Sequence, residues 1–469
     1  MTTTLDPIDL ECEVCTDDKT NPKKLFGRRR SSAFGDVRDP IAEELKDTDT
    51  SKLIYDKIPI IPFFDNGDAT LRVMRRMREL SPTHSACISN IKEYVFGGEL
   101  TTRRYVEPGM AFDTEEDVPL TDVEQTEIVD FIKGLNPDIT FEELLNISMG
   151  LYENLKTYGN AFLRIDAVRV AGQWYFYFES VDAEKCRYYM TKPKEEKVLV
   201  ISAEWTSSYI NKYPPEFVGA FPAWAEHQNG KMSTIIHVKN KVVGRDWYGV
   251  PESFGSLYWQ YMEVQQGQHG TSGYANDFVA RVFFEITAEP DADGDEDDFD
   301  EAVRQTFTNQ ADSYGNQPKR YIIRRRLPDD KEATVHEFKS NTDHEYHTAM
   351  STVAEKQVIK SHNWHTLLMG IPSPGRLGQN QEFKEVYKQY FNNVIRPWQE
   401  RCLRPIMQAF QICEQMRDGK KDVTARLTIG LFNLYSEYLK SDTQDANDKT
   451  KIDENGNNPD KGIEDGLNV

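Results

Sequence analysis

The spacing of apolar residues along the chain switches between a helical and a strand-like period. Between Ser81-Pro82 and Gly97-Gly98 the apolar residues recur every three or four positions, as on one face of a helix. Serine is a good N-cap, proline fits the first helical turn, and glycine commonly ends a helix. The sequence therefore predicts a helix between these signals, preceded by a short basic helix over 71–80.

The next region begins helical and then becomes strand-like. Thr140 and Glu143 have the T-x-x-E spacing of a capping box, and they open a predicted helix that ends at Tyr158-Gly159-Asn160. The strand-like runs that follow are AFLRI (161–165) and then QWYFYFESV, CRYYM, KVLVISAEW and STIIHVKN between 173 and 240. We predict a β-rich unit set on helices.

From Pro251 the helical period returns, and the sequence places Phe254, Leu257, Tyr258, Tyr261 and Val264 on one face. Glycines at 267, 270 and 273 weaken the following turns, so a bend or looser packing is expected there. Residues 285–301 then carry ten Asp or Glu, whereas 319–326 carry five Lys or Arg around a β-prone centre. This pattern predicts a small α+β insertion over 284–341, between two long helices.

The second of these helices, over 342–368, leads into a stretch dense in glycine and proline. Pro372 and Pro374 fix their own φ and disfavour helix in the residues before them, while glycines supply conformations that other residues avoid. Residues 369–380 therefore form a defined bend, with Asn380 as the predicted N-cap of a long helix. Two prolines inside that helix, Pro397 and Pro405, should each kink or divide it.

Charge and composition narrow the possible functions. The net charge is −21, which argues against capture of DNA or an anionic membrane by bulk attraction and suits a protein that lets a polyanion pass without binding it. We expect no signal peptide and no membrane span, because the apolar runs are too short. The basic cluster at 23–30 is either a nucleic-acid contact or part of a solvated arm, and Cys12-x-x-Cys15 is either a metal or redox motif or two reduced thiols.

Two further patterns could bind metal. Glu289, Asp291, Asp293 and Asp300 have calcium-loop spacing, although Glu296 stands where an apolar residue is usual, and a solvated acidic loop is the alternative. The four residues His344, His347, His362 and His365 form two H-x-x-H pairs. On one continuous helix the pairs would share a face but lie about 27 Å apart, which excludes one intrachain site and leaves ligation between subunits or a plain helix surface.

No catalytic residue, resident metal or cofactor is predicted. The chain has no G-x-G-x-x-G motif and no arrangement of nucleophile, base and oxyanion donors, and the 370–378 loop lacks the Gly-Lys-Ser/Thr of a phosphate loop. An enzyme is therefore the less favoured class, and a structural or interaction protein is favoured.

Four motifs in order resemble the portal proteins of tailed bacteriophages. The first is a long helix followed by G-I-P-x-P-x-x-L-G, then N-x-E and a helix with an I-x-P-W step, at Gly370 to Pro397. The others are SPTHSACISNI (81–91), YGNAFLRI (158–165) and HVKN…WYGVPES (237–253). The extra Ser373 between the two loop prolines departs from the family motif.

The resemblance implies an α+β portal-type subunit with a β-rich wing, two stem helices flanking a clip, a kinked tunnel loop, a long wing helix and a reduced crown. The implied segments are a flexible arm (1–50), wing (51–250), first stem helix (251–283), clip (284–341), second stem helix (342–368), tunnel loop (369–380), wing helix with crown (381–438) and disordered acidic tail (439–469). The loop residues expected to face the channel are Gly370, Pro372, Pro374, Gly375, Arg376 and Gly378.

The implied function is structural and non-catalytic. Twelve copies of the chain would form a ring at one capsid vertex, and double-stranded DNA would enter and leave through this ring. The ring would be assembled in the host cytoplasm. The implied partners are further copies of the chain, the major capsid protein, the large terminase subunit and a head-completion, adaptor or tail protein, with no membrane. An adaptor or baseplate component of the virion is the alternative.

Overall fold

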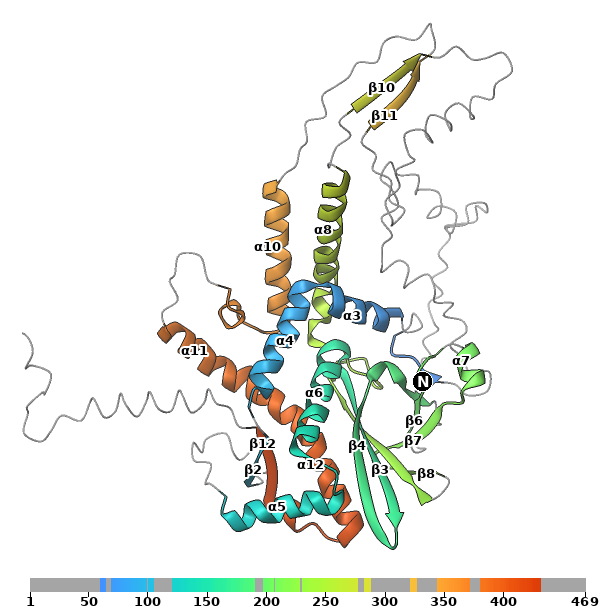
Figure 1. Cartoon of the computed structure of the whole chain (residues 1–469), viewed down its shortest axis with the longest axis vertical. Helices are drawn as coiled ribbons and strands as arrows, with labels where there is room; N and C mark the ends of the chain where they lie inside the picture. Colours follow the sequence, from blue (N-terminus) through green and yellow to red (C-terminus); the bar gives the residue numbers. More distant parts are fainter. Residues whose placement is uncertain are drawn as a thin grey trace, which may run out of the picture. The chain divides into compact units, whose positions relative to one another are not determined.

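The structure is a computed structural model. It describes residues 60–64, 69–98, 100–104, 120–189, 197–205, 207–227, 230–276, 282–287, 321–326, 344–371 and 380–431. The fold is mixed α+β (Figure 1). The chain divides into two compact units. One unit comprises 1–38 with 268–342, and the other comprises 39–267 with 343–469.

The larger unit is built on a mixed sheet. Its strands in chain order are β1 (Ile60–Ile61), β3 (Asn160–Val170), β4 (Gln173–Val181), β5 (Cys186–Tyr189), β6 (Val198–Ile201), β7 (Glu216–Ala220), β8 (Ala225–Glu226) and β9 (Met232–Lys239). In space the order is β1-β5-β6-β7-β9-β3-β4, and β8 also pairs with β9. Every pairing is antiparallel except β7 with β9. The five predicted strands are present as β3, β4, β5, β6 and β9, although β6 ends at Ile201, four residues before the end of the predicted run. Strands β1, β7 and β8 were not predicted.

Four helices precede or flank this sheet in the chain, namely α3 (Ala69–Leu80), α4 (Pro82–Phe96), α5 (Asp122–Leu135) and α6 (Phe141–Tyr158). The predicted cap of α4 is confirmed, because the Ser81 hydroxyl accepts a hydrogen bond from the His84 amide. Thr140 likewise caps α6, but the reciprocal capping box that the structure records belongs to Thr121 and Glu124 of α5. Helix α6 packs against β3 and β4.

The predicted C-terminal helix consists of three consecutive segments. They are α11 (Asn380–Tyr390), a π-helical turn (Phe391–Ile395) and α12 (Arg396–Asp418). Of the two outcomes predicted for Pro405, division of the helix does not occur, since α12 continues through this residue. Cys402, Leu403, Ile406 and Phe410 are buried around this proline, so core packing holds the turn despite the missing hydrogen bond.

After α12 the chain adds α13 (Val423–Arg426) and β12 (Leu427–Leu431), which pairs antiparallel with β2 (Leu100–Arg104). Glu414 on α12 holds the start of α13 in place. Its buried carboxylate accepts hydrogen bonds from the amides of Asp422 (2.9 Å), Val423 (2.8 Å) and Thr424 (3.1 Å).

The helix that leaves the sheet region starts with a 3-10 turn, η4 (Glu252–Ser256), and continues as α8 (Leu257–Asn276). The helix runs through its three glycines, and a Cβ at Gly267 or Gly270 would meet nothing within 4 Å. Beyond it, β10 (Val282–Thr287) pairs in parallel with β11 (Tyr321–Arg326). The β-prone centre of 319–326 is thus a strand. The acidic segment with Glu289, Asp291, Asp293 and Asp300 lies outside the described residues.

The second long helix, α10 (His344–Ser361), is shorter than predicted. Asn363 has a φ of 50°, in the left-handed region, and a 3-10 turn, η5 (Thr366–Met369), follows. The prediction of one helix over 342–368 is therefore wrong at its C-terminal end. The histidines at 362 and 365 lie beyond α10 and do not continue the helical face of His344 and His347.

Candidate functional site

A buried polar junction joins the start of α8 and the end of α10 to the body of the larger unit. The Ser256 and Ser361 hydroxyls are 2.7 Å apart, and the Gln260 amide donates to Ser256 Oγ at 3.0 Å. Ser256 and Gln260 are fully or almost fully buried. Figure 1 shows the first turns of α8 and the last turns of α10 leaving this part of the unit. Polar groups that satisfy one another inside a core fix the register of the helices that carry them.

Two imidazoles meet in the same junction. His84 Nδ1 on α4 and His362 Nε2, directly after α10, are 2.9 Å apart, and both side chains are buried. The pKa of His84 is lowered to about 3, first by burial and then by Arg78 and Lys156. The pKa of His362 is lowered well below its usual value, first by burial and then by His84. Both rings are therefore neutral at pH 7, and His362 Nδ1 has no hydrogen-bond partner among the described residues.

A buried lysine connects the junction to α12. The Lys156 ammonium on α6 is 2.9 Å from Glu252 Oε2 and 4.1 Å from the centre of the Trp398 ring. Arg401 stands over the same ring and approaches Glu252 Oε1 at 3.9 Å. Burial lowers the pKa of Lys156, and Glu252 opposes that shift. The Glu252 carboxylate therefore pairs with both Lys156 and Arg401, and both cations lie over the Trp398 ring.

The turn after α10 is held against the body by its own contacts. The Trp364 indole donates to Asn90 Oδ1 at 2.8 Å, and the Tyr94 hydroxyl donates to the Leu368 carbonyl at 3.3 Å. Cys87 Sγ lies 3.6 Å from Met369 Sδ. Gly370 then adopts a φ of 76° and ends η5, as the predicted use of glycine in this bend requires.

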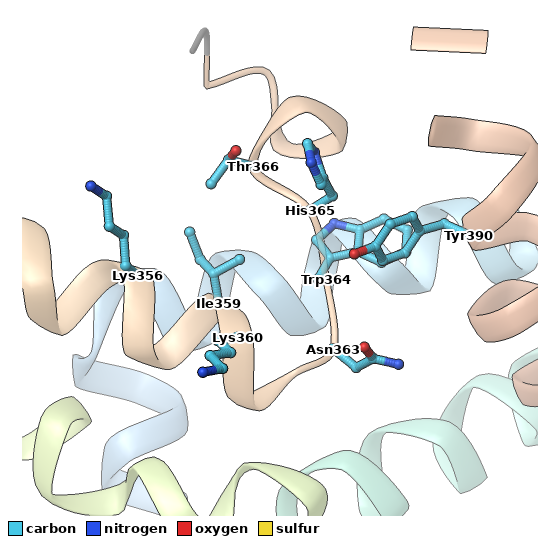
Figure 2. Close-up of a pocket in the computed structure, with 8 residues that line it drawn as sticks. All are labelled: Lys356, Ile359, Lys360, Asn363, Trp364, His365, Thr366 and Tyr390. Carbon is cyan, nitrogen blue, oxygen red and sulfur yellow. The ribbon is translucent and has the colours of Figure 1, made fainter. Parts of the chain in front are cut away.

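Two cavities border this turn. The first, of about 240 Å³, is shown in Figure 2. It is lined by Lys356, Ile359, Lys360, Asn363, Trp364, His365, Thr366 and Tyr390. Trp364 and Tyr390 meet edge to face, with ring centres 5.5 Å apart, on one side of it. The second, of about 220 Å³, lies among Glu252, Ser361, His362, Asn363, Asn393, Val394, Pro397, Trp398 and Arg401.

The structure brings together few of the site residues that the sequence singled out. Of the six expected channel-facing residues only Gly370 is described, and 372–379 lie outside the described residues. The Cys12-x-x-Cys15 pair and the basic cluster at 23–30 also lie outside them. In the described part of the chain, no group of three or more His, Cys, Asp or Glu side chains is placed to hold a metal ion. No helix there is long and apolar enough to cross a membrane.

The residues that sequence reasoning missed are Lys156, Glu252, Arg401 and His84. The lysine and Glu252 are separated by 96 positions in the chain, and His84 and His362 by 278. A pairing over such distances leaves no periodic signal. The one local hint is that Lys156 follows Leu155 on a helix whose apolar face is wide.

Comparisons with known proteins give structural neighbours only. No protein-family profile matches the chain, and no curated protein matches it. Among solved structures, a chain from the neck of an empty GTA particle, computed with C6 symmetry, has a TM-score of 0.46 and 12% identity, over 84% of this chain and 92% of that one. A chain from the virion of a native gene transfer agent (GTA) particle has a TM-score of 0.44 and 12% identity, over 81% and 89%. A chain from the neck of a native GTA particle, computed with C12 symmetry, has a TM-score of 0.41 and 12% identity, over 80% and 88%.

Proposed function

We propose that this chain is the subunit of a portal-type ring, a structural virion protein that surrounds the path of double-stranded DNA at one capsid vertex. The observation that carries the proposal is the order of the four sequence motifs, together with where they lie in the fold. The motif at 81–91 lies in α4, that at 158–165 opens β3, that at 237–253 ends in η4, and the Gly370 motif follows α10.

Three of these motifs contribute directly to the buried junction. His84 comes from the motif at 81–91 and Glu252 from the motif at 237–253. The motif that begins at Gly370 directly follows η5, which Tyr94 and Cys87 contact. The motifs thus meet at the root of two long helices, α8 and α10, and these helices bracket the segment that contains β10 and β11. A stem of two helices with an inserted clip requires this chain order.

The two helices also carry apolar groups that the chain itself leaves uncovered. Tyr258 on α8 is 85% exposed and Val353 on α10 is 39% exposed. Copies arranged around a closed ring would cover such groups, since each helix pair then packs against its neighbour. We propose a ring of twelve copies.

The acidic balance of the chain suits a channel that DNA traverses. A lining that repels phosphate lets the duplex slide, whereas a basic lining would hold it. We propose that residues 369–380 form the narrowest part of the channel and that Arg376, the only charged side chain within that loop, makes a weak, salt-screened phosphate contact.

The proposed partners follow from this role. They are the major capsid protein around the ring, the large terminase subunit during packaging, and a head-completion, adaptor or tail protein afterwards. The chain is proposed to act without catalytic residues, cofactor or membrane. A ring-forming adaptor or baseplate component remains the second candidate, because it too would use uncovered helix faces.

The assembly state tests the proposal first. Mass photometry of the purified full-length chain across a range of salt concentrations should give one closed species many times heavier than the 54.1 kDa chain. A population that remains monomeric or dimeric at every salt concentration would refute the ring.

A further inference from the structure

The His84–His362 contact is a hydrogen bond that two neutral imidazoles can form and two charged imidazoles cannot. Nδ1 of His84 faces Nε2 of His362 at 2.9 Å, so one of these nitrogens carries the hydrogen and the other accepts it. The rings are tilted by 41° with centres 4.9 Å apart. The contact joins α4 to the first residue beyond α10, and it is buried on both sides.

The charged groups that act on both imidazoles are two cations, Arg78 on α3 and Lys156 on α6. Glu263 on α8 and Glu355 on α10 act on the neighbouring Cys87, and Arg401 on α12 approaches Glu252 on η4 at 3.9 Å. Glu252 is already paired with Lys156 at 2.9 Å, and Glu263 accepts a hydrogen bond from Ser81 at 2.5 Å. The nearest cations oppose protonation of either imidazole.

Proton counting shows what acid does to the contact. The neutral pair has one hydrogen between the facing nitrogens. A first added proton binds an outer nitrogen and leaves the bridge intact, but it places a charge in a buried site beside two cations. A second added proton puts a hydrogen on both facing nitrogens, so the bridge is lost and two imidazolium ions face each other. The repulsion between the two imidazolium ions is relieved only when the rings separate and water reaches them.

We propose that the His84–His362 pair is an acid-sensitive latch, which holds the end of α10 and the turn 362–371 against α4 at neutral pH and releases them when the pair takes up protons. The turn also buries Trp364 and Leu368 in the hydrophobic core, and its polar contacts to α4 are Trp364 with Asn90 and Tyr94 with Leu368. Met369 covers Cys87, with the two sulfur atoms 3.6 Å apart. Opening of the latch therefore exposes Cys87, which is fully buried when it is closed. The latch belongs to the single chain and does not depend on ring formation.

Labelling of Cys87 at graded pH tests the latch. The full-length chain with Cys12→Ser and Cys15→Ser is treated briefly with 4,4′-dithiodipyridine, which reacts with thiols in mild acid, and the labelled sites are read by mass spectrometry. Buried Cys402 and Cys413, both on α12, report whether the core has opened as well. In the open state each imidazole is expected to titrate with the ordinary pKa of 6.5, whereas in the closed state it stays neutral. Each imidazole therefore raises the equilibrium constant for opening the latch by about 25-fold between pH 7 and pH 5.

The matched control is the double variant His84→Asn, His362→Gln. The Asn amide reproduces the position of Nδ1 and the Gln amide that of Nε2, so a bridge can persist without titrating. We expect Cys87 labelling, corrected for the reagent's own pH dependence, to rise several-hundredfold in the protein with both histidines while Cys402 stays protected. In the control variant Cys87 labelling should stay flat.

The outcomes separate cleanly. Cys87 labelling that does not rise between pH 7 and pH 5, that rises together with Cys402, or that rises equally in the control variant would overturn the latch. Should the double variant fail to protect Cys402 at pH 7, His362→Gln alone serves in its place. That variant keeps one titrating imidazole and should show a rise of only about 25-fold.

Discussion

Lys156 and Glu252 form an ion pair whose two members should respond very differently to substitution. The Lys156 side chain is 1% exposed, whereas that of Glu252 is 39% exposed. Glu252→Gln leaves a charged ammonium inside the core, with the Trp398 ring at 4.1 Å as its remaining partner. Removing the partner of a buried charge typically costs 3–5 kcal/mol, and partial solvent access at Glu252 reduces this to about 2–3 kcal/mol of unfolding free energy.

Lys156→Met should have a much smaller effect. Methionine keeps the packing over Trp398 and removes the desolvation cost of the ammonium, while Glu252 retains contact with water and with Arg401 at 3.9 Å. We expect a change of less than about 1 kcal/mol in either direction. The double variant should resemble Lys156→Met alone, because the buried charge is absent from both.

The difference between the Lys156 and Glu252 variants should also appear in how their unfolding free energies change with pH. Burial lowers the pKa of Lys156 below its usual 10.5, so the unfolded chain binds more protons above the folded pKa. The stability contribution of this lysine therefore rises with pH between its folded pKa and 10.5, and it falls as pH drops through the folded value. Loss of Glu252 lowers that pKa further, so the deficit of Glu252→Gln should shrink between pH 7 and pH 10.

Urea unfolding followed by tryptophan fluorescence at pH 7 and pH 10 measures these differences. Glu127→Gln is a suitable control, because Glu127 pairs with Arg426 on the surface and should change stability by less than about 1 kcal/mol. Equal losses of stability for Lys156→Met and Glu252→Gln, or a Glu252→Gln deficit that grows with pH, would show that the unpaired ammonium is not the source of the loss.

Glu414→Gln leaves buried amides with poorer acceptors and should lower the stability of the larger unit by about 2 kcal/mol in urea unfolding, with Glu400→Gln on the same helix as the control; an unchanged midpoint would contradict it. Tyr258→Ser should shift mass photometry from ring to free chain, whereas Tyr177→Ser, at a 50% exposed site on β4, should not; equal effects would show that α8 is not the interface. Arg376→Ala should leave rings assembled and reduce genome packaging or retention, and fully filled particles would refute the contact proposed for that loop.

Secondary structure was predicted correctly where the signal for it lies within a single turn or strand. Ser81-Pro82 capped α4 as expected, and Gly159 and Gly370 both adopt the left-handed conformation that ends a helix. The mixed α+β fold was predicted from the change of period. Strand β7 was missed because five residues, two of them Gly and Ala, give little alternation.

The errors arise where tertiary contacts override a local rule. Pro405 should break a helix, but the buried residues around it keep α12 continuous. His362 carries on an apparent helical repeat of histidines, yet α10 ends at Ser361, since Asn363 takes a left-handed φ of 50°, and His362 pairs with His84 instead. Periodicity cannot reveal such a partner, since it lies in another helix 278 positions away. For the same reason the polar junction was invisible in the sequence, although three of its segments lie in motifs that the sequence did identify.

We propose that copies of this chain close into a ring around a channel, with α8 and α10 as its stem. Cryo-electron microscopy of the purified assembly tests it directly. We expect a closed ring of twelve copies with a central opening. In it, α8 and α10 of each copy should pack against those of its neighbours through Tyr258 and Val353, and residues 369–380 should lie at the narrowest point. A reconstruction with no central channel, or one with these two helices on the outer surface and free of neighbours, would contradict it.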